Sequence, residues 1–399
     1  MQENPIKYPL AKETINNADI DSLVRWLKSY PKLTKGKETL EFEKQWAEYI
    51  GTKYAVFCNS GSSANLLMSA AAQRKINKHT TLNIVVPSVG WITTISPFIQ
   101  SNNSNLFMLD ADEKTFGIDL DELESTCQKF KIDIVMFVQV LGIPHYKERL
   151  LALQKEYGFI LLEDACAALG AKYSDNKKVG TVGDMSSFSF YFGHQLSTIE
   201  GGMVNTDDKE LYDLLLMYRS HGWGKDLDAE TYQKSMEDNN VDPFHQPFTF
   251  FEPGYNLRST DLQAYLGILQ IEKADYVTYH RNRNHKVYAR ELKDFTIQQY
   301  GDDYPVSISF GCLAKDSEHR KRIVTALVEA GVETRIFSAG NLARHPFWIN
   351  TKKNSNNILH ENGLQMANKI HERGFFLPNY PELKERDIEF ICSIVKSIE

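Results

Sequence analysis

Two stretches of the sequence place polar residues where a strand is expected to end. Asp164 closes an apolar run, and residues 59–65 (Asn-Ser-Gly-Ser-Ser-Ala-Asn) lie between a strand-like run and a helix-like run. Backbone amides at the start of a helix can bind an anion where small residues allow close approach. A carboxylate at the carboxyl end of a parallel strand lies in the ligand crevice of the sheet. Both features also occur in ordinary turns, where Asp, Ser and Gly are common.

A third stretch contains a single histidine. Residues 188–204 hold two largely aromatic, strand-like runs separated by a turn that includes His194 and ends in Gly201-Gly202. An imidazole is a general acid or base near neutral pH, but it cannot form a stable imine as a lysine amine can. Taken alone, a histidine at the end of a strand more often has no chemical role.

These residues resemble a known family, the DegT/DnrJ/EryC1/StrS sugar aminotransferases of the fold-type I, pyridoxal-phosphate-dependent enzymes. Members carry Ser-Phe, a short turn, Lys-Asn-Leu, and then Glu or Asp before Gly-Gly, and their lysine forms a Schiff base with the cofactor. Counting back from Glu200, this chain has His194 in place of that lysine. The sugar 3-dehydratase branch of the family shares the replacement. The resemblance covers about residues 8–396 and implies that the cofactor is held without a covalent link.

The resemblance also implies which residues contact the cofactor. Contacts to its phosphate fall on small residues: Gly61, Ser62, Ser63 and Ser189. Asp164 matches the carboxylate that pairs with the pyridinium nitrogen and keeps the ring able to accept electrons. Trp91 matches a tryptophan of the dehydratase branch and would stack on the ring, although a core or interface position is the usual fate of tryptophan. Related enzymes often have Gln or Glu where this chain has Ala167.

A second signature concerns assembly and substrate. Gly254-Tyr255-Asn256-Leu257-Arg258 is similar to a family motif whose asparagine reaches the phosphate of the neighbouring subunit's cofactor, so Asn256 implies a homodimer with shared active sites. The resemblance places further residues near the substrate: His221, Arg258 and Arg344. Both arginines are candidate contacts for a carboxylate or a phosphate.

The totals limit the class of protein. The chain has 399 residues, 42% of them hydrophobic and 24% charged, which is ordinary globular composition. A net charge of −7 argues against a general nucleic-acid surface. The five cysteines are scattered without a CxxC pair, and the later half has only Cys312 and Cys392, which argues against a metal, disulfide or iron–sulfur site. We expect a cytoplasmic protein, since no signal core or membrane-length apolar stretch is visible.

The elements that must position these residues alternate along the chain. Strand-like runs occupy residues 54–57, 84–86, 106–109, 132–140 and 159–162, and helix-like runs include residues 62–72 and 147–157. Apolar runs of this kind are typical of strands covered on both faces, so we expect a doubly wound, mostly parallel α/β sheet, as in fold-type I enzymes.

The later part of the chain predicts a smaller α+β unit. A helical pattern covers residues 262–294, and it precedes a strand at 306–310, a helix at 318–330 and two closing helices. We expect a large cofactor-binding domain over residues 1–260 and a smaller domain over residues 261–399. Polar residues 224–253 predict either a cover over the active site or a solvated surface insertion.

Residues and resemblance together predict a pyridoxal-phosphate-dependent sugar 3-dehydratase, a lyase of deoxysugar biosynthesis for surface polysaccharide. L-Glutamate would convert the cofactor to pyridoxamine phosphate, which would react with the C4 ketone of a nucleotide-linked 4-keto-6-deoxy sugar; the resemblance implies GDP as the nucleotide. His194 would move the protons, and ammonia and a 4-keto-3,6-dideoxy sugar would be released. Two alternatives stay open: a sugar aminotransferase that uses His194 for proton transfer, and a non-catalytic protein that binds the cofactor.

Overall fold

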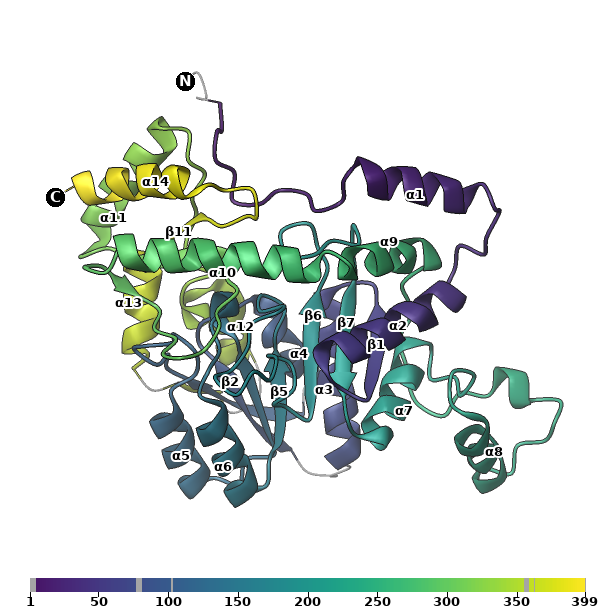
Figure 1. Cartoon of the computed structure of the whole chain (residues 1–399). Coiled ribbons are helices and arrows are strands. Elements are labelled where there is room, and N and C mark those ends of the chain that lie inside the picture. Colours follow the sequence, from purple (N-terminus) through teal and green to yellow (C-terminus); the bar gives the residue numbers. More distant parts are fainter. Residues whose placement is uncertain (1–4, 77–80, 102, 355–358, 362, 399) are drawn as a thin grey trace.

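The larger of two β-sheets organises the fold (Figure 1). The computed structural model describes residues 5–76, 81–101, 103–354, 359–361 and 363–398. The larger sheet has eight strands in the order β1-β7-β6-β5-β4-β2-β3-β10. Its strands are β1 (Tyr54–Cys58), β2 (Leu82–Pro87), β3 (Ser104–Leu109), β4 (Ile134–Val138), β5 (Ile160–Asp164), β6 (Met185–Ser189), β7 (Gly202–Thr206) and β10 (Leu359–Glu361). Only β7 runs against the other seven, so the predicted mostly parallel α/β fold is confirmed.

Strand side chains alternate between two hydrophobic cores, one on each face of this sheet. In β4, Ile134 and Met136 join one core, and Val135 and Phe137 join the other. The first core is covered by α3 (Gly61–Ile76), α4 (Ser96–Gln100) and α7 (Lys209–Arg219). The second is covered by α2 (Lys37–Ile50), α5 (Leu120–Lys129) and α6 (Lys147–Tyr157). Burial on both faces explains why the strands are continuous apolar runs in the sequence.

The smaller sheet is antiparallel and has the order β11-β9-β8. Its strands are β8 (Thr296–Ile297), β9 (Ser309–Leu313) and β11 (Gly374–Pro378). A third core joins this sheet to α10 (Ala274–Glu291), α11 (Ser317–Glu329) and α14 (Glu385–Ser397). The remaining short elements of this part are η4 (Leu342–Arg344), α12 (Pro346–Asn354) and α13 (Gln365–Arg373).

Two predictions for this part of the chain were wrong in detail. The helical pattern at residues 262–294 forms two helices, α9 (Asp261–Ile271) and α10. The strand expected at residues 306–310 begins at Ser309, because the amides of Val306 and Ile308 donate to the carbonyls of Gly142 and Leu141, at 3.0 and 3.2 Å. These bonds fasten the segment to η2 (Val140–Gly142), in the part of the chain that carries the larger sheet.

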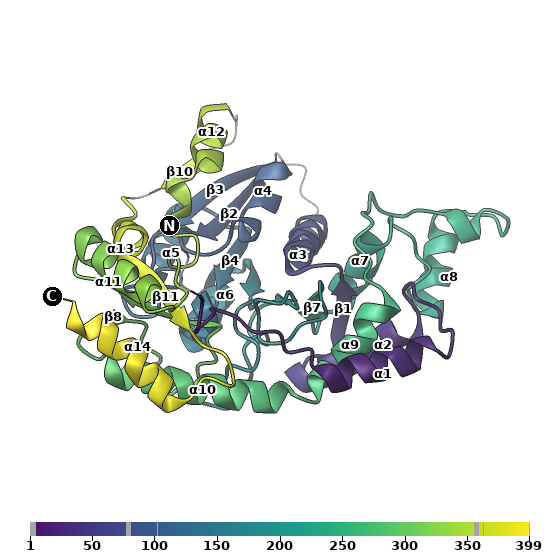
Figure 2. The ribbon, with the colours of Figure 1, turned by 90° about the horizontal axis from the view of Figure 1, so that it is seen from above.

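The division at residue 260 stays a prediction. Two later elements contact the part of the chain that builds the larger sheet, because α9 packs against α2 and β10 pairs with β3. Conversely, the N-terminal segment contacts the part of the chain that carries the smaller sheet, because Tyr8 forms a bridge with Val332. The chain then crosses the molecule to α1 (Asn17–Leu27), which packs on α9 (Figures 1 and 2).

The polar segment 224–253 forms a helical projection beside α7. It contains α8 (Ala229–Asp238) and η3 (Gln246–Phe248), and both views show α8 standing out from the body of the molecule (Figures 1 and 2). Among the helices of the described residues, none is both long and apolar enough to cross a membrane.

Candidate active site

One cavity of about 400 Å³ lies where strands of the larger sheet end. Strands β4, β5 and β6 bring Val138, Asp164 and Ser189 to its wall. Ile308 and Phe376, from beside β9 and from β11, close it on the side of the smaller sheet. The carboxyl ends of parallel strands are the usual ligand site of such sheets, and a pocket of this size suits a cofactor and part of a substrate.

The start of α3 forms a cradle of small residues in this cavity. Gly61 and Ser62 line the cavity beside Ser189. A Cβ atom added to Gly61 would lie 2.5 Å from the Cβ atom of Ser189, so any larger residue would push α3 away from β6. The amide of Ser63 donates a hydrogen bond to the hydroxyl of Ser60 at 3.1 Å, and Ser63 does not line the cavity, so the predicted contact of Ser63 with a phosphate stays a prediction. Free amides of a first helical turn beside two hydroxyls suit a phosphate.

Hydrogen bonds fix the Asp164 carboxylate at the end of β5. Its Oδ2 atom accepts from Asn65 Nδ2 at 2.9 Å and from Thr94 Oγ1 at 2.6 Å, and its Oδ1 atom accepts from the amide of Cys166 at 3.1 Å. Asn65 is oriented in turn by the Ser187 hydroxyl, which donates to it at 2.6 Å. The Asp164 carboxylate is therefore buried and held in one orientation by these hydrogen bonds. A fixed orientation of this kind is needed if the carboxylate is to pair with a ring nitrogen.

Sequence reasoning missed Asn65 and Thr94. Asn65 lies four residues after Gly61 on α3, so the helical repeat puts both on one face, and this spacing could have identified it. Thr94 ends the short helix η1 (Ile92–Thr94), and no sequence pattern marks its contact with β5.

His194 lies in the turn after β6 with its ring at the cavity. The turn is closed by its amide, which donates to the Tyr191 carbonyl at 2.9 Å. Its Nδ1 atom is buried and has no hydrogen-bond partner among the described residues. Burial lowers the pKa of His194 to about 4; the Asp164 carboxylate opposes this shift, and the Arg281 guanidinium adds to it. The imidazole is therefore neutral at physiological pH and can accept a proton.

Trp91 and Arg335 form the outer wall of the cavity. Trp91 is 52% exposed, so a face of its ring is open to a ligand. The Arg335 guanidinium lies 5.9 Å from the centre of the Trp91 ring and 5.4 Å from that of Phe376, and it donates to the Ser338 carbonyl at 3.1 Å. Among the described residues that line this cavity, Arg335 alone carries a permanent positive charge. The resemblance also places residues 335–346 near the substrate, but within that stretch Arg344, and not Arg335, was the predicted anion contact.

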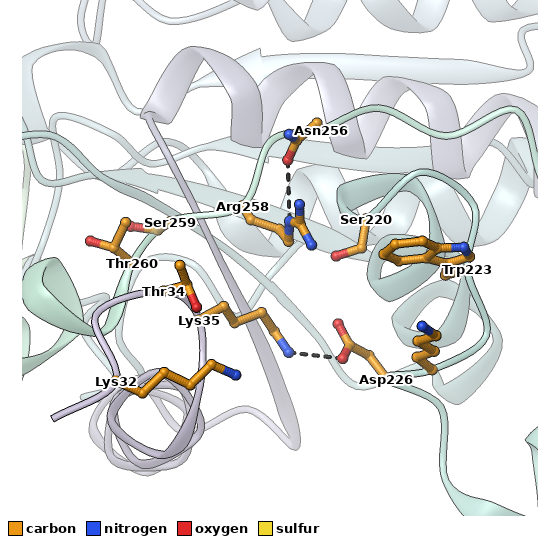
Figure 3. Close-up of a pocket in the computed structure, with 11 residues that line it drawn as sticks. Lys32, Thr34, Lys35, Ser220, Trp223, Asp226, Asn256, Arg258, Ser259 and Thr260 are labelled. Atoms are coloured by element: carbon orange, nitrogen blue, oxygen red, sulfur yellow. Dashed lines mark hydrogen bonds and ion pairs between the residues drawn. The ribbon is translucent and has the colours of Figure 1, made fainter. Parts of the chain in front are cut away.

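Asn256 and Arg258 lie elsewhere, in a second pocket of about 410 Å³ (Figure 3). Arg258 Nε donates to Asn256 Oδ1 at 3.2 Å, and Arg258 Nη2 lies 3.2 Å from Nε2 of His221. Lys35 on the opposite wall pairs with Asp226 at 2.8 Å. Further lysines line this pocket, namely Lys32 and Lys225. The predicted residues therefore divide into two groups, and the two cavities share no lining residue in the described part of the chain.

Two predicted features lie outside the first cavity. Arg344 is on η4, pairs with Glu372 at 2.9 Å and lines neither cavity in the described chain, so its contact with substrate stays a prediction. Within residues 224–253, Lys225 and Asp226 line the second pocket, and no residue of this segment lines the cavity around His194.

Comparison with known proteins gives consistent matches over the whole chain. The sequence model of the DegT/DnrJ/EryC1/StrS aminotransferase family matches residues 14–396. GDP-4-keto-6-deoxy-D-mannose 3-dehydratase of Yersinia pseudotuberculosis is 34% identical over 354 residues, which cover 86% of this chain and 88% of the relative.

Two solved structures are also similar to this chain over nearly its whole length. Escherichia coli GDP-4-keto-6-deoxy-D-mannose-3-dehydratase with bound hydrated PLP has a TM-score of 0.86 and 29% identity, over 98% of this chain and 100% of that chain. A structure of GDP-4-keto-6-deoxymannose-3-dehydratase with a trapped PLP-glutamate geminal diamine has a TM-score of 0.84 and 28% identity, with the same coverage.

Proposed function

Because the chain belongs to the DegT/DnrJ/EryC1/StrS aminotransferase family, we propose that it is a sugar dehydratase dependent on pyridoxal phosphate and L-glutamate. Its substrate is a GDP-linked 4-keto-6-deoxy sugar, which loses its C3 oxygen to give a 4-keto-3,6-dideoxy sugar for deoxysugar biosynthesis. Glutamate becomes 2-oxoglutarate, and its nitrogen leaves as ammonia. The observation that carries the proposal is His194, which stands where aminotransferases have lysine, in a cavity that is also lined by five of the predicted cofactor contacts: Gly61, Ser62, Trp91, Asp164 and Ser189.

The cavity fits pyridoxal phosphate. The cradle at Gly61, Ser62 and Ser189 would hold the phosphate, the Asp164 carboxylate would face the pyridinium nitrogen, and Trp91 would stack on the ring. When bound, the cofactor supplies a protonated ring that accepts electrons from a bond broken next to it. Contacts with the chain are all non-covalent, because an imidazole cannot form a stable imine.

His194 is the proton-transfer residue. As a neutral, half-buried imidazole it accepts a proton, and once charged it is an acid that can donate to the departing C3 hydroxyl. The lysine amine that completes a transamination in the related enzymes is missing, so the sugar leaves without nitrogen.

Arg335 is the anion contact of this cavity. L-Glutamate carries two carboxylates at neutral pH, and a buried or half-buried carboxylate requires a charged partner. Arg335 has the only permanent positive charge among the described lining residues, and the rings of Trp91 and Phe376 limit its orientation.

A homodimer with shared active sites completes the proposal. The second pocket supports it, because Asn256 and Arg258 lie there and not in the cavity of their own chain. Two exposed aromatic side chains contact Trp223 of this pocket and are suited to burial against a partner: Phe248 and Phe250 are 69% and 53% exposed. Three lysines in the same pocket add positive charge for a phosphate.

A nitrogen-tracing experiment tests the proposed reaction. The purified protein is incubated with pyridoxal phosphate, GDP-4-keto-6-deoxymannose and ¹⁵N-glutamate, and the products are analysed by mass spectrometry. We expect a sugar that has lost one oxygen, together with 2-oxoglutarate and ¹⁵N-ammonia. A sugar that keeps its oxygen and gains ¹⁵N would identify an aminotransferase instead, and failure of glutamate to alter the cofactor's absorbance would identify a non-catalytic binder.

A further inference from the structure

Arg281 of α10 is a fully buried arginine that contacts the backbone of the His194 turn. Its guanidinium donates to the carbonyls of Ile308 at 2.9 Å, His194 at 3.4 Å and Ser307 at 3.5 Å, and also to that of Asn379. In the described part of the chain no carboxylate lies within ion-pair distance of it.

A buried charge of this kind requires an explanation. Moving a cation out of water without an ion-pair partner is unfavourable. Burial lowers the pKa of Arg281 to about 10, the more distant Glu382 carboxylate opposes this shift, and the guanidinium stays charged at neutral pH. A leucine or methionine would fill the space without this penalty. What an arginine adds is a planar set of donors that can bind several carbonyls at once, and a permanent charge.

The carbonyls that Arg281 binds belong to separate segments. Ser307 and Ile308 precede β9, Asn379 follows β11, and His194 lies in the turn after β6. Gln195 reinforces the same junction, since its side-chain amide donates to the carbonyls of Ala167 at 2.6 Å and Val306 at 3.0 Å. The turn that carries His194 is thus fastened to the ends of the smaller sheet.

We propose that Arg281 is a positioning residue for His194: it holds the His194 turn against the smaller sheet and sets a fixed positive charge beside the imidazole. This inference rests on the proposed function, in which His194 must begin the reaction as a neutral base.

The charges around the imidazole give the direction of the effect. Asp164, from β5, attracts a proton to His194, and Arg281, from α10, disfavours it. The backbone of Cys166 also favours the protonated ring. Other titratable or charged residues line the same cavity: Tyr191, Glu200 and Arg335. Burial is the largest of the effects that lower the pKa of His194, and Arg281 adds to it. With the charge of Arg281 removed, that addition is lost, so the pKa of His194 should rise.

The test measures the titration of His194 directly. Holoenzyme labelled with ¹³C at histidine Cε1 is titrated by NMR, and the His194 signal is identified by its loss in His194→Asn. In Arg281→Gln, which is neutral, we expect the His194 midpoint to rise by about one pH unit, a tenfold change in proton affinity. In Arg281→Lys, which keeps the charge, the midpoint should stay within about 0.3 unit of the wild type.

Equal midpoints in Arg281→Gln and Arg281→Lys would overturn the inference, because the charge would then have no effect on His194. If Arg281→Gln does not fold, Arg281→Lys alone tests the inference. Lysine keeps the charge but cannot bind several carbonyls, so the His194 titration midpoint should be unchanged while kcat falls by roughly tenfold. An unchanged kcat would remove the positioning role. The titration does not depend on turnover, so its failure is distinguishable from failure of the ammonia-release experiment.

Discussion

At position 194 an imidazole stands where related enzymes have an amine, and burial, aided by the charge of Arg281, keeps the ring neutral. The sequence predicted this residue, together with Asp164 and Ser189, because strand ends and the Gly-Gly pair fix their register along the chain. Arg335 and Arg281 were not predictable in the same way. Arg335 lines the cavity itself, but its orientation depends on Trp91, which is distant in sequence, and Arg281 acts on the cavity through His194. Such contacts leave no local pattern.

Arg335 gives a prediction for glutamate binding. Changing Arg335→Gln removes the positive charge of the cavity, so the KM for L-glutamate should rise by roughly 10- to 100-fold, the usual effect of losing a charge-assisted hydrogen bond. Steady-state kinetics of 2-oxoglutarate formation measure it. Arg344→Gln is the matched control, since Arg344 pairs with Glu372 outside the cavity, and its KM should change by less than about threefold. If only the KM for the sugar nucleotide rose, Arg335 would bind the sugar nucleotide and not L-glutamate.

At the scale of elements, the position of α3 against β6 determines the phosphate cradle. The sequence predicted α3 and α6, each of which covers one of the two sheet cores, but its strand-like run began at residue 188 and so overlaps only the end of β6. It misplaced the start of β9, where the amides of Val306 and Ile308 bond to a loop and not to a neighbouring strand. Whether a backbone amide bonds to a neighbouring strand or to another segment depends on tertiary contacts and not on the local β-propensity of the sequence.

The cradle is tested by Gly61→Ala. The new Cβ atom would lie 2.5 Å from Ser189 Cβ, so α3 and β6 must separate, and the Kd for pyridoxal phosphate should rise by about tenfold or more. Absorbance or fluorescence titration of the apoprotein measures this. Gly193→Ala is the control: Gly193 also lines the cavity, but its added Cβ would meet only the Tyr191 ring at an ordinary 3.5 Å. Equal affinity in both variants would show that the cradle does not bind the phosphate.

At the scale of the whole molecule, the predicted residues lie in two separate pockets, an arrangement that the proposed homodimer with shared active sites would require. The sequence placed Asn256 in a motif, but its separation from the His194 cavity is a property of the folded chain.

Subunit mixing tests shared sites. His194→Asn and Asn256→Asp should each be inactive alone, the second because a carboxylate would repel the cofactor phosphate. After the two proteins are unfolded, mixed in equal amounts and refolded, half of the dimers pair one chain of each kind, and these have one intact site, so activity should recover to about a quarter of the wild type. Activity no higher than that of the separate variants would contradict an active site built from two chains.

Buried histidines predict how the stability of the whole molecule depends on pH. Burial and the charge of Lys286 lower the pKa of His285 to about 3, and burial lowers that of His145 to about 4, from an ordinary value of 6.5. Above about pH 7.5 these rings are neutral in both the folded and the unfolded state and contribute no pH dependence. As the pH falls from 6.5 towards 4 the unfolded chain takes up protons that the folded chain does not, so the free energy of unfolding decreases.

His285→Asn isolates one of these groups, since an asparagine can still bond to the Ser307 hydroxyl that His285 contacts at 2.9 Å. Between about pH 7.5 and pH 5 the variant should lose roughly 2 kcal/mol less unfolding free energy than the wild type, measured by urea denaturation. An equal loss in both proteins would mean that His285 is protonated in the folded state.

The most direct test of the central claim is the dehydration rate of His194→Asn. Asparagine is similar in size but is not a base, so the variant should bind pyridoxal phosphate as the wild type does, by absorbance, and dehydrate the sugar at least roughly 100-fold more slowly. His221→Asn is the control, because His221 contacts Arg258 in the second pocket and not the cavity. The account predicts a large loss in the first variant and a smaller one in the second. Near-normal dehydration by His194→Asn would contradict it, and a loss confined to His221→Asn would assign the proton transfer to that residue.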